Sequence, residues 1–243
     1  MPGRRITWFR RRSLWLPTLP GWILLAALAA LCAALFVAVL YPFLSSGAPL
    51  PRASILVIEG WVHDNAVREA QRIAENEGYE TICAAGVDLT KGSLLAEYGD
   101  FATLTAATLE RLGTPKDQIL AAPGGAGQRH RTYFSAAAVR RALEDHGALQ
   151  GNINVLTVGP HARRTALVYQ KVFRDTPCRV GIIQTPPEDY DPRRWWSTSN
   201  GAKSVITEAI AWFHEFTLNG GRDKLAQQAL TSPYPRPQPA PAQ

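Results

Sequence analysis

The chain has 243 residues, of which 46% are hydrophobic and 19% charged, which is enough for one globular domain with a sizeable core and appended segments. Its formal charge of +6 at pH 7 is unevenly placed, because five arginines and no acidic residue precede residue 21. The remainder carries 21 basic and 20 acidic side chains. This near balance argues against a basic nucleic-acid-binding face, so no nucleic acid is expected as a partner.

An uncharged apolar segment, residues 22–44, follows the basic residues 1–21. An α-helix rises 1.5 Å per residue, so about 20 apolar residues cross the hydrocarbon layer of a membrane. Trp22 and Tyr41 lie near the two ends, where amphipathic rings favour the interface. A cleaved signal peptide is the main alternative, but its apolar region would span only about 7–15 residues. The sequence therefore predicts a retained transmembrane helix that binds the lipid bilayer.

Charge bias predicts the orientation of this helix. Five arginines precede it, whereas Arg52 is the only basic residue in the dozen positions that follow. By the positive-inside rule, the N-terminus lies in the cytoplasm and residues 45–243 lie across the membrane. In a bacterium, this is a single-pass inner-membrane protein with a periplasmic C-terminal domain.

Residues 45–53 form an expected linker, and apolar runs alternate with helix-like segments from residue 54 to residue 220. In chain order, strands are expected at 54–62, 80–86, 117–123, 152–159 and 178–185. Helices are expected at 65–78, 100–113, 131–147, 160–173 and 201–217. Gly78 provides a plausible αL end to the first of these helices. Residues 221–243, with five prolines in the last 13 positions, are expected to be a disordered tail.

Continuous Val, Ile and Leu runs are typical of parallel strands that are buried on both faces. The predicted fold is a three-layer Rossmann-like α/β sandwich with a mainly parallel sheet of about five strands. Ligands of such sheets bind beyond the carboxyl ends of the strands, near the point where the strand order reverses. The loops that follow the strands are therefore the candidate site.

The first two of these loops contain one acidic and one glycine candidate. Glu59 ends the first strand, where a buried carboxylate needs a donor such as Arg68 or a substrate hydroxyl. Gly86 ends the second strand and opens a flexible polar loop that lacks the spacing of a phosphate-binding loop. No G-x-G-x-x-G motif is present, which disfavours a standard dinucleotide site.

The third strand leads into a glycine-rich loop with basic residues. Gly124 and Gly125 permit close backbone approach, and Arg129 and Arg131 precede or open a helix whose free N–H groups suit an anion. A glycine turn with solvated charges is the simpler alternative. The interpretation adopted is contact with an anionic ligand.

The fourth strand ends at Gly159 and runs directly into a helix. Pro160 suits the first helical position, and His161 and Arg164 are three residues apart, so they share one helix face. Arginine near a helix N-terminus opposes the macrodipole, a cost that a bound anion would remove. A structural histidine remains the alternative.

Trp195 and Trp196 are adjacent in a polar, proline-bearing loop after the fifth strand. They could wall a ligand pocket, stack on a sugar or rest on the membrane interface. At least one is expected to cover the end of the core.

Cysteine and histidine usage gives no metal site. Cys83 and Cys178 occupy apolar strand-like positions, which favour packed thiols, although the sequence leaves a bridge between them open. The five histidines are dispersed without ligand spacing. No metal and no cofactor is assigned.

Several of these segments resemble the DUF218 domain family of the ElyC, SanA and YdcF type. TVGPHARRTA is similar to a strand followed by His-x-x-Arg-Ala in that family, although Thr165 precedes the alanine. RTYFSA is similar to Thr-x-x-Asn-Ala, with Ser135 replacing the asparagine. The turn at Gly86 and the position of Arg68 in the first helix are similar too, and the resemblance covers residues 54–217.

The resemblance implies a Rossmann-like fold behind one membrane helix and a role in the bacterial cell envelope, without a settled reaction. It points to His161, Arg164, Thr132 and Arg68. We therefore expect the domain to bind or process a phosphorylated, anionic envelope precursor, with Glu59 or His161 as acid–base group. The full ligand-binding set is Arg68, Gly86, Gly124, Gly125, Arg129, Arg131, Thr132, Gly159, Arg164, Trp195 and Trp196.

Two other functions are retained as alternatives. One is a non-catalytic envelope regulator or scaffold, which would use the proline-rich tail and the tryptophan loop. The other is a nucleotide-type ligand-binding domain, which the fold allows but the missing glycine fingerprint disfavours.

Overall fold

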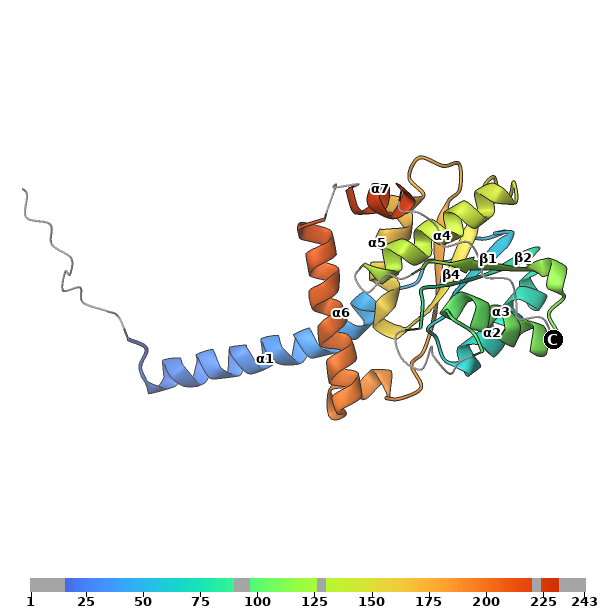
Figure 1. The fold of residues 1–243 in the computed structure, drawn as a ribbon. Coiled ribbons are helices and arrows are strands. Elements are labelled where there is room, and N and C mark those ends of the chain that lie inside the picture. The colour runs from blue at the N-terminus through green and yellow to red at the C-terminus, as the bar shows by residue number, and fades with distance from the viewer. Residues whose placement is uncertain (1–15, 90–96, 126–129, 220–223, 232–243) are drawn as a thin grey trace, which may run out of the picture. The chain divides into compact units, whose positions relative to one another are not determined.

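The computed structural model describes residues 16–89, 97–125, 130–219 and 224–231 (Figure 1). The chain divides into two compact units, Met1–Val39 and Leu40–Gln243. Helix α1 spans Leu19–Leu44, and within the described ranges it is the one helix long and apolar enough to cross a membrane. This confirms the predicted apolar helix. The boundary between the units falls inside α1, so its last turn belongs to the second unit.

A five-stranded parallel sheet forms the centre of the second unit, as predicted. Its strands are β1 (Ile55–Glu59), β2 (Thr81–Gly86), β3 (Ile119–Pro123), β4 (Ile153–Val158) and β5 (Val180–Thr185). Their spatial order is β3-β2-β1-β4-β5, and all four neighbouring pairs are parallel. The chain moves outward from β1 to β3 and then returns to the other side of β1, so the order reverses between β1 and β4.

Helices cover both faces of this sheet, which gives the three layers that the alternating pattern predicts (Figure 1). Successive strand residues point to opposite faces, so Val57 packs with one helical layer and Leu56 with the other. The first layer contains α4 (Arg131–Asp145), α5 (Ala162–Val172) and α7 (Lys224–Thr231). The second contains α2 (Asp64–Glu77) and α3 (Phe101–Arg111).

The remaining elements are three 3₁₀ turns and a long helix. The turns are η1 (Lys116–Gln118), η2 (Gly159–His161) and η3 (Pro192–Ser197), and α6 (Ser199–Thr217) contacts α5 and both η2 and η3. Pro160 lies in η2, so the helix predicted to begin there starts with a tighter turn. Two boundaries match the sequence signals: Gly78 ends α2 in the αL conformation, and Asp100 caps α3 by accepting from the Thr103 N–H at 2.8 Å.

The expected linker, residues 45–53, lies against β5 for part of its length. The Ile182 N–H donates to the Ala48 carbonyl at 3.1 Å. The fully buried Asn154 side chain accepts from the Leu50 N–H at 2.8 Å and donates to the Leu50 carbonyl at 3.0 Å. Because these bonds satisfy backbone groups of the segment, it forms part of the domain edge.

The expected disordered tail was assigned too early in the chain. Residues 224–231 form α7, whose Ala226 and Ala229 are buried against the α4 layer. Arg141 of α4 donates to the Ala229 carbonyl at 3.0 Å and so helps to end this helix. The proline-rich residues 232–243 lie outside the described residues. Cys83 and Cys178 are free, buried thiols, as predicted, and burial raises the pKa of Cys83 to about 12.

Candidate functional site

A cavity of about 610 Å³ lies at the carboxyl edge of the sheet, where the strand order reverses. The ends of β1, β2 and β4 contribute Glu59, Gly86 and Val158 to its walls. The N-terminus of α4, the turn after β4 and the inner face of α6 complete it. The rule for open α/β sheets therefore located the cavity correctly from the sequence.

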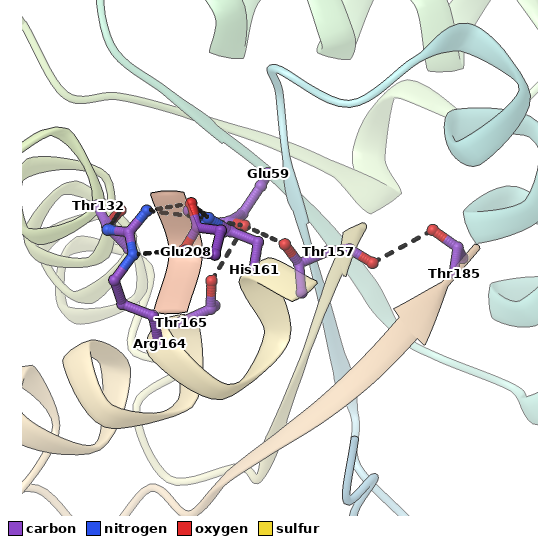
Figure 2. Close-up of polar contacts among 8 residues, drawn as sticks. All are labelled: Glu59, Thr132, Thr157, His161, Arg164, Thr165, Thr185 and Glu208. Carbon is purple, nitrogen blue, oxygen red and sulfur yellow. Dashed lines mark hydrogen bonds and ion pairs between the residues drawn. The ribbon is translucent and has the colours of Figure 1, made fainter. Parts of the chain in front are cut away.

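Glu59 is buried at the floor of this cavity, with 2% of its surface exposed. Its carboxylate accepts from the hydroxyls of Thr157 at 2.5 Å and Thr165 at 3.3 Å (Figure 2). The ion pair with Arg68, one of the donors considered from the sequence, does not form. The buried positions of α2 are 66, 67, 70 and 74, so Arg68 lies on the solvent side of that helix and outside the cavity.

His161 lies between two carboxylates from distant parts of the chain. Its Nδ1 is 2.9 Å from Oε1 of Glu208 in α6, and its Nε2 is 3.7 Å from Oε2 of Glu59 (Figure 2). The latter distance exceeds a hydrogen bond, and Nε2 is buried without a hydrogen-bond partner among the described residues. Trp61 packs edge-on against the imidazole with ring centroids 4.9 Å apart. The ring is therefore held through one nitrogen only.

Glu208 also binds Arg164 through both of its oxygens. Arg164 donates from Nε to Oε2 at 2.8 Å and from Nη2 to Oε1 at 3.0 Å, and its Nη1 donates to the Thr132 hydroxyl at 3.2 Å (Figure 2). Burial acts to raise the pKa of Glu208, but the charges and bonds of His161 and Arg164 outweigh it and lower that pKa to about 2. Nδ1 of His161 is also 2.9 Å from Nη2 of Arg164, so whether it donates to Glu208 or accepts from Arg164 depends on the tautomer of the ring.

Glu208 was missed by the sequence interpretation, which attended to the loops. A usable signal exists nonetheless, because Glu208 and Glu215 are the two acidic residues of α6 and, being seven residues apart, lie on one face of the helix. Two acids on a helix face that points into a protein require partners. Such a pair could have marked α6 as a wall of the site.

Glu215 is the centre of a second polar cluster at the same cavity. It forms an ion pair with Lys171 of α5 and accepts from the Tyr133 hydroxyl of α4 at 2.5 Å and from Asn219 Nδ2 at 3.1 Å. Burial acts to raise the pKa of Glu215, and the bonds from Lys171, Tyr133 and Asn219 more than offset this, so the pKa falls. This cluster joins three helices behind the cavity.

The cavity gathers part of the predicted ligand-binding set. Gly86, Arg131, Thr132 and Arg164 line it together with Glu59 and His161. A Cβ atom at Gly86 would lie 2.5 Å from that of Phe101, so the glycine is needed for the close approach of α3 to the strand end.

Other predicted residues serve the packing around the site. Gly124 and Gly125 follow β3 but do not line the cavity, and a Cβ atom at Gly124 would lie 3.2 Å from the backbone of Phe134 in α4. Gly159 has a positive φ of 52°, which lets the chain turn from β4 into η2. Arg129 lies outside the described residues.

The two tryptophans do not wall the cavity. Trp195 is buried, with 4% of its surface exposed, but it is not among the residues of the two core layers, so its expected role of covering the end of the core stays a prediction. Trp196 packs edge-on against it and leaves 51% of its surface exposed.

Four of the five histidines, dispersed in the sequence, line the cavity: His63, His130, His161 and His214. No three His, Cys, Asp or Glu side chains within the described ranges are arranged to hold a metal ion. Both charge signs are present, since Asp189 joins the three glutamates on the wall and Arg131 joins Arg164. Arg131 forms no ion pair with any residue that the structure describes, and its guanidinium lies 5.7 Å from the centroid of the Phe101 ring.

In comparisons with known proteins, no family model matches the chain, and neither does any curated protein or solved structure. The resemblance to the DUF218 family thus stays a prediction from short motifs. The site is interpreted below from its own geometry.

Proposed function

We propose that the cavity binds a phosphorylated, anionic envelope precursor at the membrane and that His161 serves as its acid–base group. The observation that carries this proposal is the state of the His161 ring. Nδ1 is 2.9 Å from both Glu208 Oε1 and Arg164 Nη2, while Nε2 is buried, has no hydrogen-bond partner among the described residues and is 3.7 Å from the carboxylate of Glu59. A carboxylate that fixes one imidazole nitrogen and leaves the other for proton transfer is a recurring arrangement in enzymes.

Within this proposal, the anionic group of the ligand is bound by Arg131 rather than by Arg164. Arg164 is engaged with Glu208 through two hydrogen bonds, so its charge is already balanced. Arg131 is exposed at the first position of α4, where the free N–H groups of the helix also favour negative charge. Thr132 follows it on the cavity wall and adds a hydroxyl.

The cellular setting of the proposal comes from α1 and from the family resemblance. A helix that can span a membrane supports anchoring, and the charge bias of the N-terminus supports a periplasmic domain at the bacterial inner membrane. A phosphorylated precursor at that surface fits both the resemblance and a cavity whose wall includes Arg131, which forms no ion pair with any described residue.

The test is ligand binding to the full chain in nanodiscs, with inorganic phosphate and a sugar phosphate as probes. Arg131→Ala should weaken binding about tenfold or more, because a charge-assisted hydrogen bond is lost. Arg68→Ala is the matched control, since this exposed arginine lies outside the cavity, and it should bind like the wild type. Equal binding by both variants, or no binding by the wild type, would contradict the assignment.

A non-catalytic binding or scaffold role is the second candidate, and the charge balance of the cluster favours it. Glu208, Arg164 and His161 satisfy one another and fasten α6 to α5 and η2. His161→Asn separates the two roles. If the variant binds the ligand but no longer turns over a sugar phosphate that the wild type does turn over, His161 is catalytic. If both chains bind the ligand and the wild type itself shows no turnover, the result supports a scaffold role.

A further inference from the structure

The outer face of α6 is apolar and exposed over most of its length. Ile206, Ile210, Phe213 and Phe216 are spaced by four, three and three residues, so they form one stripe on the helix. Their exposed fractions are 40%, 66%, 62% and 57%. Scattered apolar residues on a surface are ordinary, but a continuous stripe with two phenylalanines indicates a binding surface.

This stripe carries no negative charge. The two glutamates of α6, Glu208 and Glu215, point inward to the cavity, and the exposed ionisable residues of the helix are Lys203 and His214. An apolar helix face bordered by basic rather than acidic groups is suited to the interface of an anionic bilayer.

The stripe is next to the point where the membrane-spanning helix joins the domain. Phe43, in the last turn of α1, packs edge-on against Trp212 of α6 with ring centroids 4.8 Å apart. The guanidinium of Arg163 lies 3.9 Å from the centroid of the Phe43 ring, and its Nε donates to the Phe43 carbonyl at 2.6 Å. Trp212 in turn stacks on Phe216, which is part of the stripe. A continuous aromatic contact therefore connects the end of α1 to the exposed face.

Chain length makes this contact informative about the occupant. The first unit ends at Val39, and four residues of α-helix advance the chain by about 6 Å before Phe43. The spanning part of α1 is therefore joined to the contact between Phe43 and Trp212 of α6 by only a few residues of chain.

We propose that the outer face of α6, from Ile206 to Phe216, rests in the headgroup–acyl boundary of the membrane that α1 spans. The domain is then both anchored by a helix and laid on the bilayer through a second, interfacial helix. This inference rests on α1 as a membrane span and is independent of the proposed chemistry in the cavity.

The test is spin-label accessibility in the full chain reconstituted in vesicles of mixed anionic and zwitterionic phospholipid. Cys83 and Cys178 are buried, so Cys32→Ala is the one replacement needed before single cysteines are introduced. Labels at Ile210→Cys and Phe213→Cys should collide preferentially with oxygen, which concentrates in lipid, over a water-soluble nickel complex. Leu104→Cys is the matched control, because this exposed leucine lies on α3, and its label should favour the nickel complex.

Two results would overturn the proposal. Labels at both α6 positions that behave like the Leu104 label place the face in water, whatever a label in α1 reports. Labels shielded from both collision partners place the face against protein, either a second copy or another partner. In either case the proposed chemistry at His161 stays untouched, since no residue of the stripe lines the cavity.

Discussion

Glu208 contacts both His161 and Arg164, and these contacts make the stability of the protein sensitive to acid. The pKa of Glu208 is about 2 in the folded protein, against 4.5 for an ordinary glutamate. A lowered carboxylate pKa stabilises the fold above the unfolded value, and this contribution is lost as pH falls from about 4.5 to about 2. A shift of this size corresponds to about 3 kcal/mol at neutral pH.

We therefore expect Glu208→Gln to lower the free energy of unfolding by about 3 kcal/mol at pH 7 and by much less near pH 2. The measurement is denaturant unfolding of the detergent-solubilised chain, followed by tryptophan fluorescence at both pH values. Glu144→Gln, in a partly exposed pair with Arg140, is the control and should change little at either pH. A Glu208→Gln penalty that is the same at both pH values would argue against an ionised Glu208.

At the scale of single residues, the sequence pointed to side chains at and just after the strand ends, but it did not show which residues these side chains would bond. Glu59, Thr132, His161 and Arg164 could be proposed because parallel strands bring their carboxyl ends to one edge. Which donor each acid would use could not be read, since Arg68 and the threonines of β4 and α5 were equally plausible before the α2 register was known. Such pairings depend on which face of each helix turns toward the sheet, and short motifs do not specify this.

Among the elements, α7 shows how packing can fix a segment that composition leaves open. Its eight residues are too few for a stable isolated helix, so its stability comes from burying Ala226 and Ala229. The pattern of Leu225, Ala226, Ala229 and Leu230 is helical, but the prolines that follow dominated the interpretation. Five of the six helices in the second unit that the structure describes were anticipated, because each is longer and has a clear start or stop signal.

Ala229→Glu should release α7 from the α4 layer, because a buried unpaired carboxylate costs several kcal/mol, more than the docking of so short a helix provides. Hydrogen exchange should then show fast-exchanging amides across residues 224–231 and slow amides retained in β1 and β4. Gln227→Glu introduces the same charge on the exposed face of the same helix and should leave exchange unchanged. Slow α7 amides in the Ala229→Glu chain would show that the helix is held by other contacts.

For the whole molecule, the parallel sheet could be predicted from the sequence, whereas the contacts between the last turn of α1 and the domain could not. Strands that are apolar on both faces need a layer of helices on each side of the sheet, and few folds meet this requirement. The apolar residues 41–44 were assigned to the span, yet Tyr41 and Leu44 are buried in the second unit. Composition cannot distinguish an apolar side chain that faces lipid from one that faces protein.

Arg163 holds this junction, so its removal should expose the chain that follows. We expect Arg163→Ala to speed tryptic cleavage after Arg52 roughly tenfold, because loss of about 1.4 kcal/mol raises the open population by that factor. Mass spectrometry of full chain in nanodiscs would measure the rate. Arg72→Ala on the exposed side of α2 is the control, and equal rates for the two variants would show that Arg163 does not secure the junction.

The hydrogen bonds that hold Ala48 and Leu50 at the edge of the domain also shorten the free length of the linker between α1 and the domain. A free linker of about nine residues has an end-to-end distance of roughly 15–18 Å, which would let a tethered domain sweep a volume above the membrane and capture soluble ligands there. Here that slack is taken up by β5 and Asn154. Lengthening residues 45–53 would restore that slack without altering the residues of the cavity.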